Sequence, residues 1–385
     1  MEKTKERRKS QDCKNFELKI DKSKLTKASL SYFSSLFTEL KWVYNHFLSE
    51  PDIFHVDTKI DKVNALDKDR NPVVHDLKHI SSQMKQAIHR RQISSINTLS
   101  TLKKQGKKVG RLKYRSRVDS VTLDQFGITY KIDGNFLRLQ GNRNMKFKLL
   151  GLGQLPKDAD IANAVLVRIN NDFFLKVTCF VPKVIQESFP CESVGIDAGC
   201  STTLTLSDGT KYDVKFPVSR KTRLLQRKLK NKPSQKTKSR KSKNCLKLYG
   251  RINKSIERTN ARKKDRINKI VSEITNKFEN ICMQDENVKG WHSGNHGKAV
   301  QFSSVGGIIR DLQRKSHTFI EVDRFFPSTQ RCSGCHGRQK VGLKERIFVC
   351  IHCGFVIDRD LNASLNILQE GLRIKLIKIQ KLPME

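Results

Sequence analysis

Four cysteines near the carboxyl end constrain the fold more than any other feature of this 385-residue sequence. Cys332 and Cys335 form one C-x-x-C pair, and Cys350 and Cys353 form a second pair after 14 intervening residues. Each pair places two thiolates on one turn, and a hairpin between them can bring the pairs together. Four sulfurs complete a tetrahedron. The spacing therefore predicts a closed, structural Zn²⁺ site, a zinc ribbon, over residues 330–353.

The other six of the ten cysteines have no partner spacing, and we assign them no role. This usage favours a reduced compartment with one metal site over a disulfide framework. No apolar run approaches the roughly 20 residues of a membrane-spanning helix. Residues 1–20 are charged and lack the apolar centre of a secretory signal. We therefore expect a cytoplasmic protein with no membrane partner.

The charge balance predicts a polyanionic partner. Lys and Arg total 76 against 38 Asp and Glu, a formal net charge of +38, and such an excess repels itself. Residues 215–266 contain 21 Lys or Arg against Glu257 and Asp265. Apolar side chains at helical spacing predict two long basic helices there, with a break over 231–244. A solvated face is the plainer explanation of a charge run, but this density of one sign favours contact with nucleic acid.

The first half of the chain predicts a small β-barrel that contains inserted helices. Residues 15–21 and 124–185 show strand patterns with turn residues between them. Residues 23–50 and 74–105 show helical periodicity, and the aromatic side chains of the first helix are expected to pack in a core. The helices would then be an insertion into the barrel.

Two segments of the first half fit neither pattern. Residues 51–75 are predicted to be mostly loop. Residues 106–123 are basic, contain glycines, and carry Tyr114 between Lys113 and Arg115. Such a segment can follow a phosphate backbone, although the sequence alone assigns these three side chains no definite role.

Carboxylates lie at several strand and helix ends of the second half. Asp197 ends an apolar strand in "GIDAG", Asp358 and Asp360 lie at a helix start in "DRDLN", and Glu286 and Glu321 follow or occupy later strands. Converging carboxylates in a basic protein are costly without a cation. Two Mg²⁺ ions would neutralise them and stabilise both oxygens of a phosphodiester hydrolysis. Taken singly, each acid is explained by a surface loop or by plain helix capping.

Five motifs occur in an order that identifies a resemblance. They are "GIDAG", "QDENVKGW", "RFFPSTQRCSGC", "CIHCG" and "DRDLNASLNI". Over 190–372 the chain resembles the TnpB proteins of bacterial insertion sequences, which are relatives of compact type V CRISPR nucleases and of Fanzor proteins. Over 15–185 the resemblance is looser, and the helix-in-barrel order suits the family's recognition and wedge domains.

The resemblance implies a multidomain α+β fold in which a small β-barrel with an inserted helical domain precedes an RNase H-like (RuvC) α/β domain interrupted by a zinc ribbon. It implies a guide RNA transcribed from the transposon end and a double-stranded DNA target beside a short flanking motif. It also implies a bacterial, nucleoid-associated location. The expected domains are a disordered basic arm (1–14), the barrel (15–22 and 106–188), the helical domain (23–105), the nuclease domain (189–329 and 354–372), the zinc ribbon (330–353) and a tail (373–385).

Carried over residue by residue, the family's first catalytic aspartate falls on Asp197 and its last on Asp360, with Asp358 as the neighbour to test next. The zinc ligands fall on the four cysteines of the ribbon. The usual middle glutamate falls on Gln284, which is a departure from the family pattern. A subset of the family has a rearranged active site whose glutamate comes from elsewhere. We expect Glu321 to take that role with Asp197 and Asp360 at Mg²⁺, with Glu286 as the close alternative.

Three functions are compatible with these residues. The first is an RNA-guided, Mg²⁺-dependent DNA endonuclease. The second is a nuclease-inactive, RNA-guided DNA-binding repressor, which Gln284 supports and which the presence of Asp197, Asp358 and Asp360 opposes. The third is a transposase that catalyses strand transfer, or an accessory DNA-binding protein of one. The third reading needs the same carboxylates, so the sequence discriminates against it only weakly.

Overall fold

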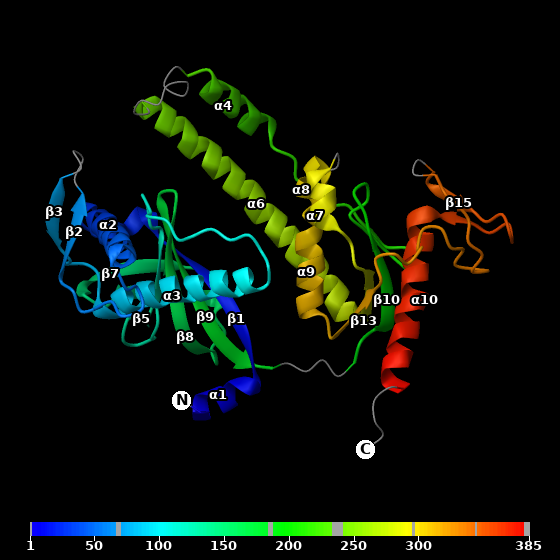
Figure 1. The fold of residues 1–385 in the computed structure, drawn as a ribbon, viewed down its shortest axis with the longest axis horizontal. Coiled ribbons are helices and arrows are strands. Elements are labelled where there is room, and N and C mark those ends of the chain that lie inside the picture. Colours follow the sequence, from blue (N-terminus) through cyan, green and yellow to red (C-terminus); the bar gives the residue numbers. More distant parts are fainter. Residues whose placement is uncertain are drawn as a thin grey trace. The chain divides into compact units, whose positions relative to one another are not determined.

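The computed structural model describes residues 2–66, 71–183, 188–232, 242–294, 297–342 and 345–380 (Figure 1). The chain divides into two compact units, residues 1–185 and 186–385. Across the described ranges, no helix combines the length and apolar character needed to cross a bilayer. Part of the break predicted over 231–244 lies outside the described residues, as do residues 381–385 of the predicted tail.

A seven-stranded, nearly closed antiparallel sheet forms the centre of the first unit, with strand order β4-β8-β9-β1-β7-β6-β5. The first strand pairs with β9 over most of its length and with β7 at its end, so the early strand joins the later ones as predicted. It begins at Gln11, four residues before the predicted start. The strands are β1 (Gln11–Ile20), β4 (Ser120–Leu123), β5 (Tyr130–Asp133), β6 (Phe136–Leu139), β7 (Asn142–Leu150), β8 (Asp160–Ile169) and β9 (Asp172–Pro182).

The segment between β1 and β4 is largely helical. Helix α2 (Lys27–Ser49) and helix α3 (Ser82–Lys104) are separated by a hairpin of β2 (Lys62–Leu66) and β3 (Pro72–Asp76). The prediction of a loop over 51–75 was wrong for this hairpin. The amino-terminal residues also differ from the expected disordered arm, because they contain helix α1 (Glu2–Lys9).

Helix α3 begins eight residues later than the sequence pattern predicted, and local hydrogen bonds explain the delay. Ser81 caps the helix by accepting a hydrogen bond from the Met84 N–H. Just before it, the buried Glu39 carboxylate of α2 accepts the backbone N–H groups of His79 and Ile80 at 2.8 and 3.0 Å. These N–H groups are therefore bonded to a side chain and do not extend the helix.

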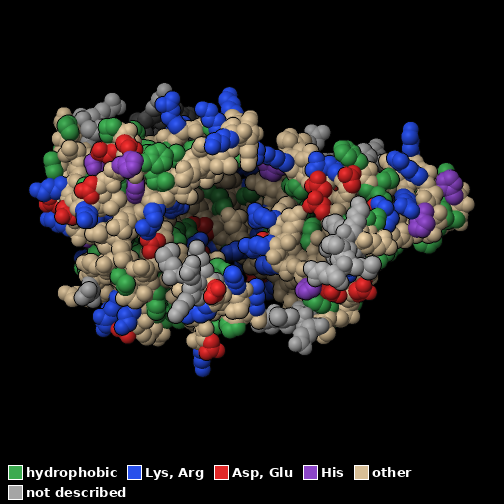
Figure 2. All heavy atoms as spheres, turned by 60° about the horizontal axis from the view of Figure 1, so that its bottom comes forward, with side chains coloured by type: hydrophobic (Ala, Val, Ile, Leu, Met, Phe, Trp, Pro, Cys, Tyr) green, Lys and Arg blue, Asp and Glu red, His purple; other side chains and the backbone are tan. Residues whose placement is uncertain are grey.

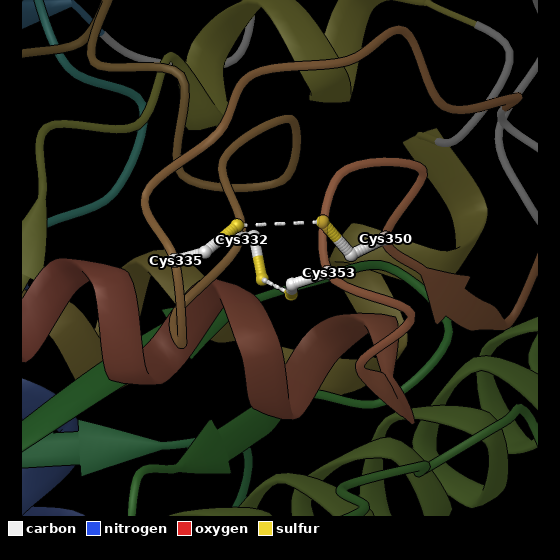
Figure 3. Close-up of side chains that lie close together, drawn as sticks. All are labelled: Cys332, Cys335, Cys350 and Cys353. Carbon is white, nitrogen blue, oxygen red and sulfur yellow. Dashed lines mark hydrogen bonds between the residues drawn. The ribbon is translucent and has the colours of Figure 1, made fainter.

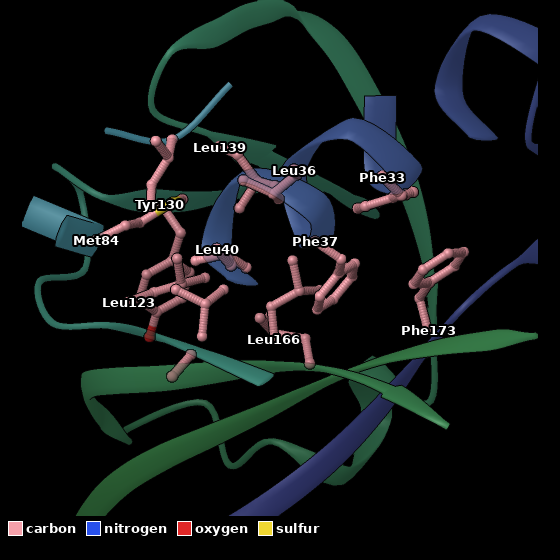
Figure 4. Close-up of a cluster of buried hydrophobic side chains, with 14 of the residues drawn as sticks. Phe33, Leu36, Phe37, Leu40, Met84, Leu123, Tyr130, Leu139, Leu166 and Phe173 are labelled. Carbon is pink, nitrogen blue, oxygen red and sulfur yellow. The ribbon is translucent and has the colours of Figure 1, made fainter. Parts of the chain in front are cut away.

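The aromatic stripe of α2 packs in the core of the first unit, as the sequence predicted (Figure 4). The ring centroids of Phe33 and Phe173 lie 4.3 Å apart, and those of Phe33 and Phe147 lie 4.5 Å apart. Each fully buried side chain of this size contributes about 1.5–3 kcal/mol of transfer free energy. Packing of α2 against the sheet therefore holds the inserted helices to the strands.

A five-stranded mixed sheet organises the second unit, with strand order β12-β11-β10-β13-β14. Strands β10, β13 and β14 are parallel, so their carboxyl ends meet at the same edge, while β11 and β12 are antiparallel additions. Their bounds are β10 (Cys191–Ala198), β11 (Leu204–Leu206), β12 (Lys211–Tyr212), β13 (Phe278–Gln284) and β14 (Thr318–Val322).

Helix α10 (Arg359–Gln380) covers one face of this sheet at very close range. A Cβ placed on Gly195 of β10 would lie 2.1 Å from the Ser364 carbonyl oxygen, and one on Gly371 would lie 2.4 Å from Cys282 Sγ. The two glycines therefore allow helix and sheet to touch. The helix continues to Gln380, beyond the predicted end at 372, because the apolar periodicity persists there.

The other face of the sheet packs against α6 (Lys243–Lys277) and α9 (Val305–Lys315). Helix α6 has 35 residues and joins the second predicted basic helix to the helix that leads into β13. The first basic helix is α4 (Arg220–Lys230), which contacts α6. On the face drawn in Figure 2, Lys and Arg side chains are spread more widely than Asp and Glu. The remaining described α-helices and β-strands are α7 (Val288–Ser293), α8 (Gly297–Ser303), β15 (Ile347–Val349) and β16 (Val356–Asp358).

Candidate active site and cysteine cluster

Asp197 lies near the end of β10, at the carboxyl edge of the parallel strands. The strand runs through the core, which leaves this carboxylate half-buried beside the start of α10. Burial, followed by the negative charges of Asp360 and Glu286, raises the pKa of Asp197 to about 7. The positive charge of Arg359 opposes this rise. The ionised form of Asp197 is therefore disfavoured by the negative charges of Asp360 and Glu286.

Asp358 performs a capping role at the beginning of α10. Its Oδ1 accepts the backbone N–H groups of Asp360 and Leu361 at 3.1 and 3.0 Å, and its Oδ2 accepts a hydrogen bond from Lys211 Nζ at 2.8 Å. Burial acts to raise the pKa of Asp358, but the hydrogen bonds from Lys211 and the backbone outweigh it and hold the pKa below the usual value. The plain capping explanation thus applies to Asp358.

Asp360 lies in the first turn of α10, and its carboxylate contacts arginine side chains, whereas that of Asp358 bonds the backbone and Lys211. Its side chain is 18% exposed and forms ion pairs with Arg359 at 3.3 Å and with Arg346 at 3.8 Å. Among the charges that raise the pKa of Asp197, Asp360 has the largest effect. Of the two aspartates in "DRDLN", Asp360 is therefore the one that acts most strongly on Asp197.

Glu286 follows β13 by two residues and is half-buried. Burial and the adjacent charge of Asp285 raise the pKa of Glu286 to about 7, against the opposing charge of Arg324. Glu286 in turn raises the pKa of Asp197. Glu286 and Asp360 therefore both act electrostatically on Asp197, and we call these three residues the electrostatic cluster.

Glu321 occupies β14 beside β13, as expected, but on the opposite face from Gln284. Its register partner is Met283, whereas Gln284 pairs with Val322. Side chains alternate between faces along a strand, so the two polar residues point in opposite directions. Glu321 is exposed and accepts a 3.4 Å hydrogen bond from Gln313 of α9. The negative charges that raise the pKa of Asp197 are those of Asp360, Glu286 and Asp358.

A pocket of about 220 Å³ connects these two glutamates. Glu286 and Glu321 both line it, together with Arg310 and Gln313 of α9. Glu286 therefore faces this pocket and also acts on Asp197. The role expected for Glu321 at a metal ion remains a prediction. Of the two glutamates, Glu286 is the one whose charge raises the pKa of Asp197.

Gln284 occupies the position expected for the family's glutamate, and its side chain forms hydrogen bonds to backbone carbonyl oxygens. Its Nε2 donates to the carbonyl oxygens of Asp323, Arg324 and Phe326 at 2.7–3.0 Å. Its Oε1 accepts a hydrogen bond from Ser328 Oγ at 2.9 Å. The side chain is therefore fully engaged in holding the loop that follows β14.

Two asparagines of α10 continue this network toward the cysteines. Asn366 Nδ2 donates to the carbonyl oxygens of Ser328 and Arg331, at 2.8 and 2.6 Å. Asn362 Nδ2 donates to the Arg331 carbonyl oxygen at 2.7 Å, and its Oδ1 accepts the Ser333 N–H at 2.9 Å. Both asparagines are at most 1% exposed. The first cysteine turn is thereby fastened to the helix that begins with Asp360.

The four predicted cysteines converge (Figure 3). Their sulfur atoms lie within 4.8 Å of one another, with 3.8 Å between Cys332 and Cys353 and 3.5 Å between Cys335 and Cys350. Within the part of the chain that is described, this is the one group of three or more His, Cys, Asp or Glu that meets that spacing. The cluster could hold a metal ion, and the carboxylates lie farther apart.

Three basic residues at the carboxylates were not singled out from the sequence. Arg346 reaches Ser201 Oγ at 3.0 Å as well as Asp360, and it belongs to the segment between the two cysteine pairs. Lys211 and Arg359 are the other two. The position of Arg359 between two aspartates was a usable signal. Arg346 and Lys211 lie far from Asp358 and Asp360 in the sequence, so no sequence pattern indicated these contacts.

Residues 308–367 match the TNB domain of the Cas12f1-like family. The matched region runs from α9 through the cysteine cluster into α10, and it contains Asp360 and all four cysteines. A protein of Streptomyces pristinaespiralis, provisionally named an RNA-guided DNA endonuclease, is 30% identical over 186 residues. That alignment covers 47% of this chain and 45% of the relative.

Two TnpB-like proteins of Acanthamoeba polyphaga mimivirus are each 27% identical over 224 residues, covering 51% of this chain and 41% of the relative. Over about half of its length, the chain is therefore similar to TnpB-like proteins. The alignments span less than half the length of these curated relatives. The resemblance to TnpB proteins that the motifs indicated is thus confirmed.

Two solved structures of Cas12 proteins are also similar to this chain. A Cas12f1 complex with guide RNA and target DNA gives a TM-score of 0.47 at 15% identity, covering 74% of this chain and 70% of the other. CasPhi-2 (Cas12j) bound to crRNA and phosphorothioate DNA gives 0.38 at 10% identity, with coverage of 94% and 91%.

Proposed function

We propose that this protein is an RNA-guided DNA endonuclease that hydrolyses phosphodiester bonds at a RuvC-type carboxylate site. The observation that carries the proposal is the electrostatic cluster of Asp197, Glu286 and Asp360 at the carboxyl edge of a mixed sheet. The names of the curated relatives support the same activity. The basic helices α4 and α6 supply cations for nucleic-acid backbones.

The residues of this cluster fit divalent cations. Carboxylate oxygens are the ligands that Mg²⁺ prefers, and the raised pKa values of Asp197 and Glu286 reflect burial and repulsion that a cation would offset. Asp197, Glu286 and Asp360 would hold Mg²⁺, with Glu321 as the alternative third ligand. When bound, the ions would activate a water molecule and stabilise the leaving oxygen.

The chain's own side chains supply the rest of the site. Asp358 fixes the start of α10 through its capping bonds and so positions Asp360. Arg346 is more than half exposed and can contact a phosphate oxygen of the substrate. The four cysteines would hold a structural Zn²⁺, because four thiolates close a tetrahedral site.

The partners follow from the same proposal. A guide RNA from the transposon end would pair with one strand of a double-stranded DNA target and read its sequence, while the protein holds the backbone and reads a short flanking motif. We further propose that the protein works in a bacterial cytoplasm, beside the nucleoid. The net charge of +38 supports two polyanionic partners.

Cleavage by the purified RNA complex tests this function. The protein is co-expressed with its RNA and incubated with Mg²⁺ and a plasmid that carries the matched target. We expect cutting that needs guide and Mg²⁺ and that is lost in Asp197→Asn, with RNA binding retained. The exposed Asp265→Asn variant on α6 should cut normally. Guide-dependent binding without any cutting by the native protein would overturn the proposal.

The middle carboxylate is assigned by comparing Glu286→Gln with Glu321→Gln in the same assay. We expect Glu286→Gln to lower cutting by roughly 100-fold, because an amide is a poorer Mg²⁺ ligand than the carboxylate it replaces. A comparable loss in Glu321→Gln alone would instead assign Glu321. Full activity in both variants would contradict the proposed carboxylate site.

A nuclease-inactive, RNA-guided DNA binder is the second candidate. The engagement of Gln284 in four hydrogen bonds favours it, because this amide is not available as a ligand. The two candidates agree on RNA and DNA binding and differ only in hydrolysis. Target binding that blocks transcription, with no cleavage across a range of Mg²⁺ and Mn²⁺ concentrations, would establish the second.

A further inference from the structure

A groove of the first unit shares no residue with the carboxylate cluster and has no role in the proposed hydrolysis. It has a volume of about 970 Å³ and lies between the end of α2, the second half of α3 and the segment that follows α3. Seven of its lining residues are apolar, and we call them the apolar floor: Leu48, Pro51, Ile53, Ile96, Leu99, Val109 and Leu112. An open apolar floor of this kind costs free energy in water, so a partner that covers it is expected.

Residues 107–115, here called the strap, form one wall of this groove and are held at both ends. At the first end, Gly106 adopts a φ of 72° and lets the chain leave α3, after which the strap turns back over the same unit (Figure 1). At the second end, Arg115 exchanges two hydrogen bonds with the Asn45 side chain, at 2.8 and 2.9 Å. The Arg115 guanidinium also lies 4.3 Å from the Tyr44 ring centre. The wall is therefore built into the fold.

The rim of the groove carries positive charge and one exposed aromatic ring. Lys103, Arg111 and Lys113 line it, against Glu50 as the acid among the described lining residues. Tyr114 also lines it and is 65% exposed. The anchored strap holds the backbone of Tyr114 in place, and the ring points outward from it.

We propose that this groove binds unpaired nucleotides of a single-stranded nucleic acid. Tyr114 stacks on a base, the apolar floor accepts a second base or its sugar, and the three rim cations bind the flanking phosphates. Aromatic stacking combined with a cationic track is the general mode of single-strand binding. A duplex is disfavoured because its bases are stacked on one another and present no free face to Tyr114. The site is distinct from the nuclease site and does not depend on cleavage.

Fluorescence of 2-aminopurine tests the proposal directly. Ten-nucleotide single strands that contain this base, as RNA and as DNA, are mixed with the full chain, and a duplex of the same sequence serves as a third probe. Stacking on Tyr114 quenches the fluorescence. We expect quenching of single strands by the native protein and by Tyr114→Phe, and loss of quenching with about tenfold weaker binding in Tyr114→Ala.

Matched variants distinguish base stacking on Tyr114 from the non-specific attraction of a nucleic acid to a basic protein. Phe136→Ala removes another exposed ring of the same unit and should bind like the native protein. Lys113→Gln should keep the quenching but reduce the slope of log affinity against log salt by about 0.7, the value for one phosphate of a single strand. Melting temperatures of the Tyr114 and Lys113 variants should match that of the native protein, because both residues are exposed.

The RNA and DNA arms identify the source of the strand. Stronger quenching with RNA assigns the groove to the guide, and stronger quenching with DNA assigns it to the opened target; either outcome supports the site. Unchanged quenching in Tyr114→Ala, or equal quenching by the duplex, would overturn it. Since cleavage is never measured, the result is independent of the nuclease proposal.

Discussion

Ser328 Oγ donates a hydrogen bond to Gln284 Oε1 at 2.9 Å, and this contact joins the end of β13 to the loop after β14. The Gln284 Nε2 group meanwhile donates to three backbone carbonyl oxygens. Both ends of the amide are thus used, and the side chain is 8% exposed. The surroundings suit an amide and would repel a carboxylate, because carbonyl oxygens cannot donate to it.

We predict that Gln284→Glu destabilises the protein and does not create a new metal ligand. An ionised carboxylate here would face three carbonyl oxygens in a buried position, at a cost of roughly 2–5 kcal/mol. Urea unfolding should show the loss as a lower midpoint. Gln226→Glu, at an exposed position of α4, is the matched control and should change little. Equal midpoints for Gln284→Glu and the native protein would contradict this account of the amide.

The pKa values of Asp197 and Glu286 predict how stability depends on pH. Both are raised to about 7 in the folded protein, above the usual values of 3.8 and 4.5. Between about pH 4 and pH 7 the folded state therefore binds more protons than the unfolded state. The free energy of unfolding should fall as pH rises through this window, and should be insensitive to these groups below it.

Unfolding in urea without added Mg²⁺, at pH 5 and pH 7.5, measures this dependence. Asp197→Asn should reduce the difference between the two pH values, while the exposed Asp265→Asn should not. Added Mg²⁺ should raise the stability at pH 7.5 more than at pH 5, since the ionised carboxylates bind it. A pH dependence that is the same in Asp197→Asn and the native protein would refute the assignment.

The sequence predicted what local periodicity and spacing determine. It located the four cysteines, the strand that ends near Asp197 and the two parallel strands that contain Gln284 and Glu321. Those features depend on a repeat of two, on a turn, or on the fixed spacing of C-x-x-C. Each can be determined within a short window of residues.

The sequence could not determine which side chains meet. A one-residue difference in register decides whether Glu321 shares a face with Gln284, and no pattern in β14 specifies that register. Asp358 and Asp360 look equivalent in "DRDLN", yet backbone geometry makes the first a cap. Arg346 reaches Asp360 only through the folded cysteine segment. Long-range packing, which is absent from any short window, decides all three.

Asn362 should control how firmly the first cysteine turn is attached to α10. Its side chain bonds the Arg331 carbonyl and the Ser333 N–H and is fully buried. Asn362→Ala leaves the Ser333 N–H unsatisfied, while the Arg331 carbonyl oxygen keeps its hydrogen bond from Asn366. We therefore expect a loss of roughly 1–3 kcal/mol and faster trypsin cleavage after Arg331. Gln369→Ala removes one exposed bond to the Ser333 carbonyl and should have a smaller effect. Equal trypsin rates in the two variants would argue against a fastening role for Asn362.

Arg346 should be required for cutting and dispensable for binding. Its guanidinium lies 3.8 Å from the Asp360 carboxylate and remains more than half exposed, so it is available to a phosphate oxygen. Loss of one donor to a developing negative charge typically lowers turnover by about 10²–10³. We expect that loss in Arg346→Ala, with unchanged target binding in a gel-shift assay.

Two further variants separate a phosphate contact of Arg346 from a structural role. Arg346→Lys keeps the charge but loses the planar donor pair, and it should cut at an intermediate rate. Arg338→Ala removes an exposed arginine of the same cysteine segment, bonded to Gln330, and should cut normally. If Arg346→Ala instead weakened target binding and melting temperature together while Arg338→Ala did not, Arg346 would be a structural residue that holds the cysteine segment on Asp360.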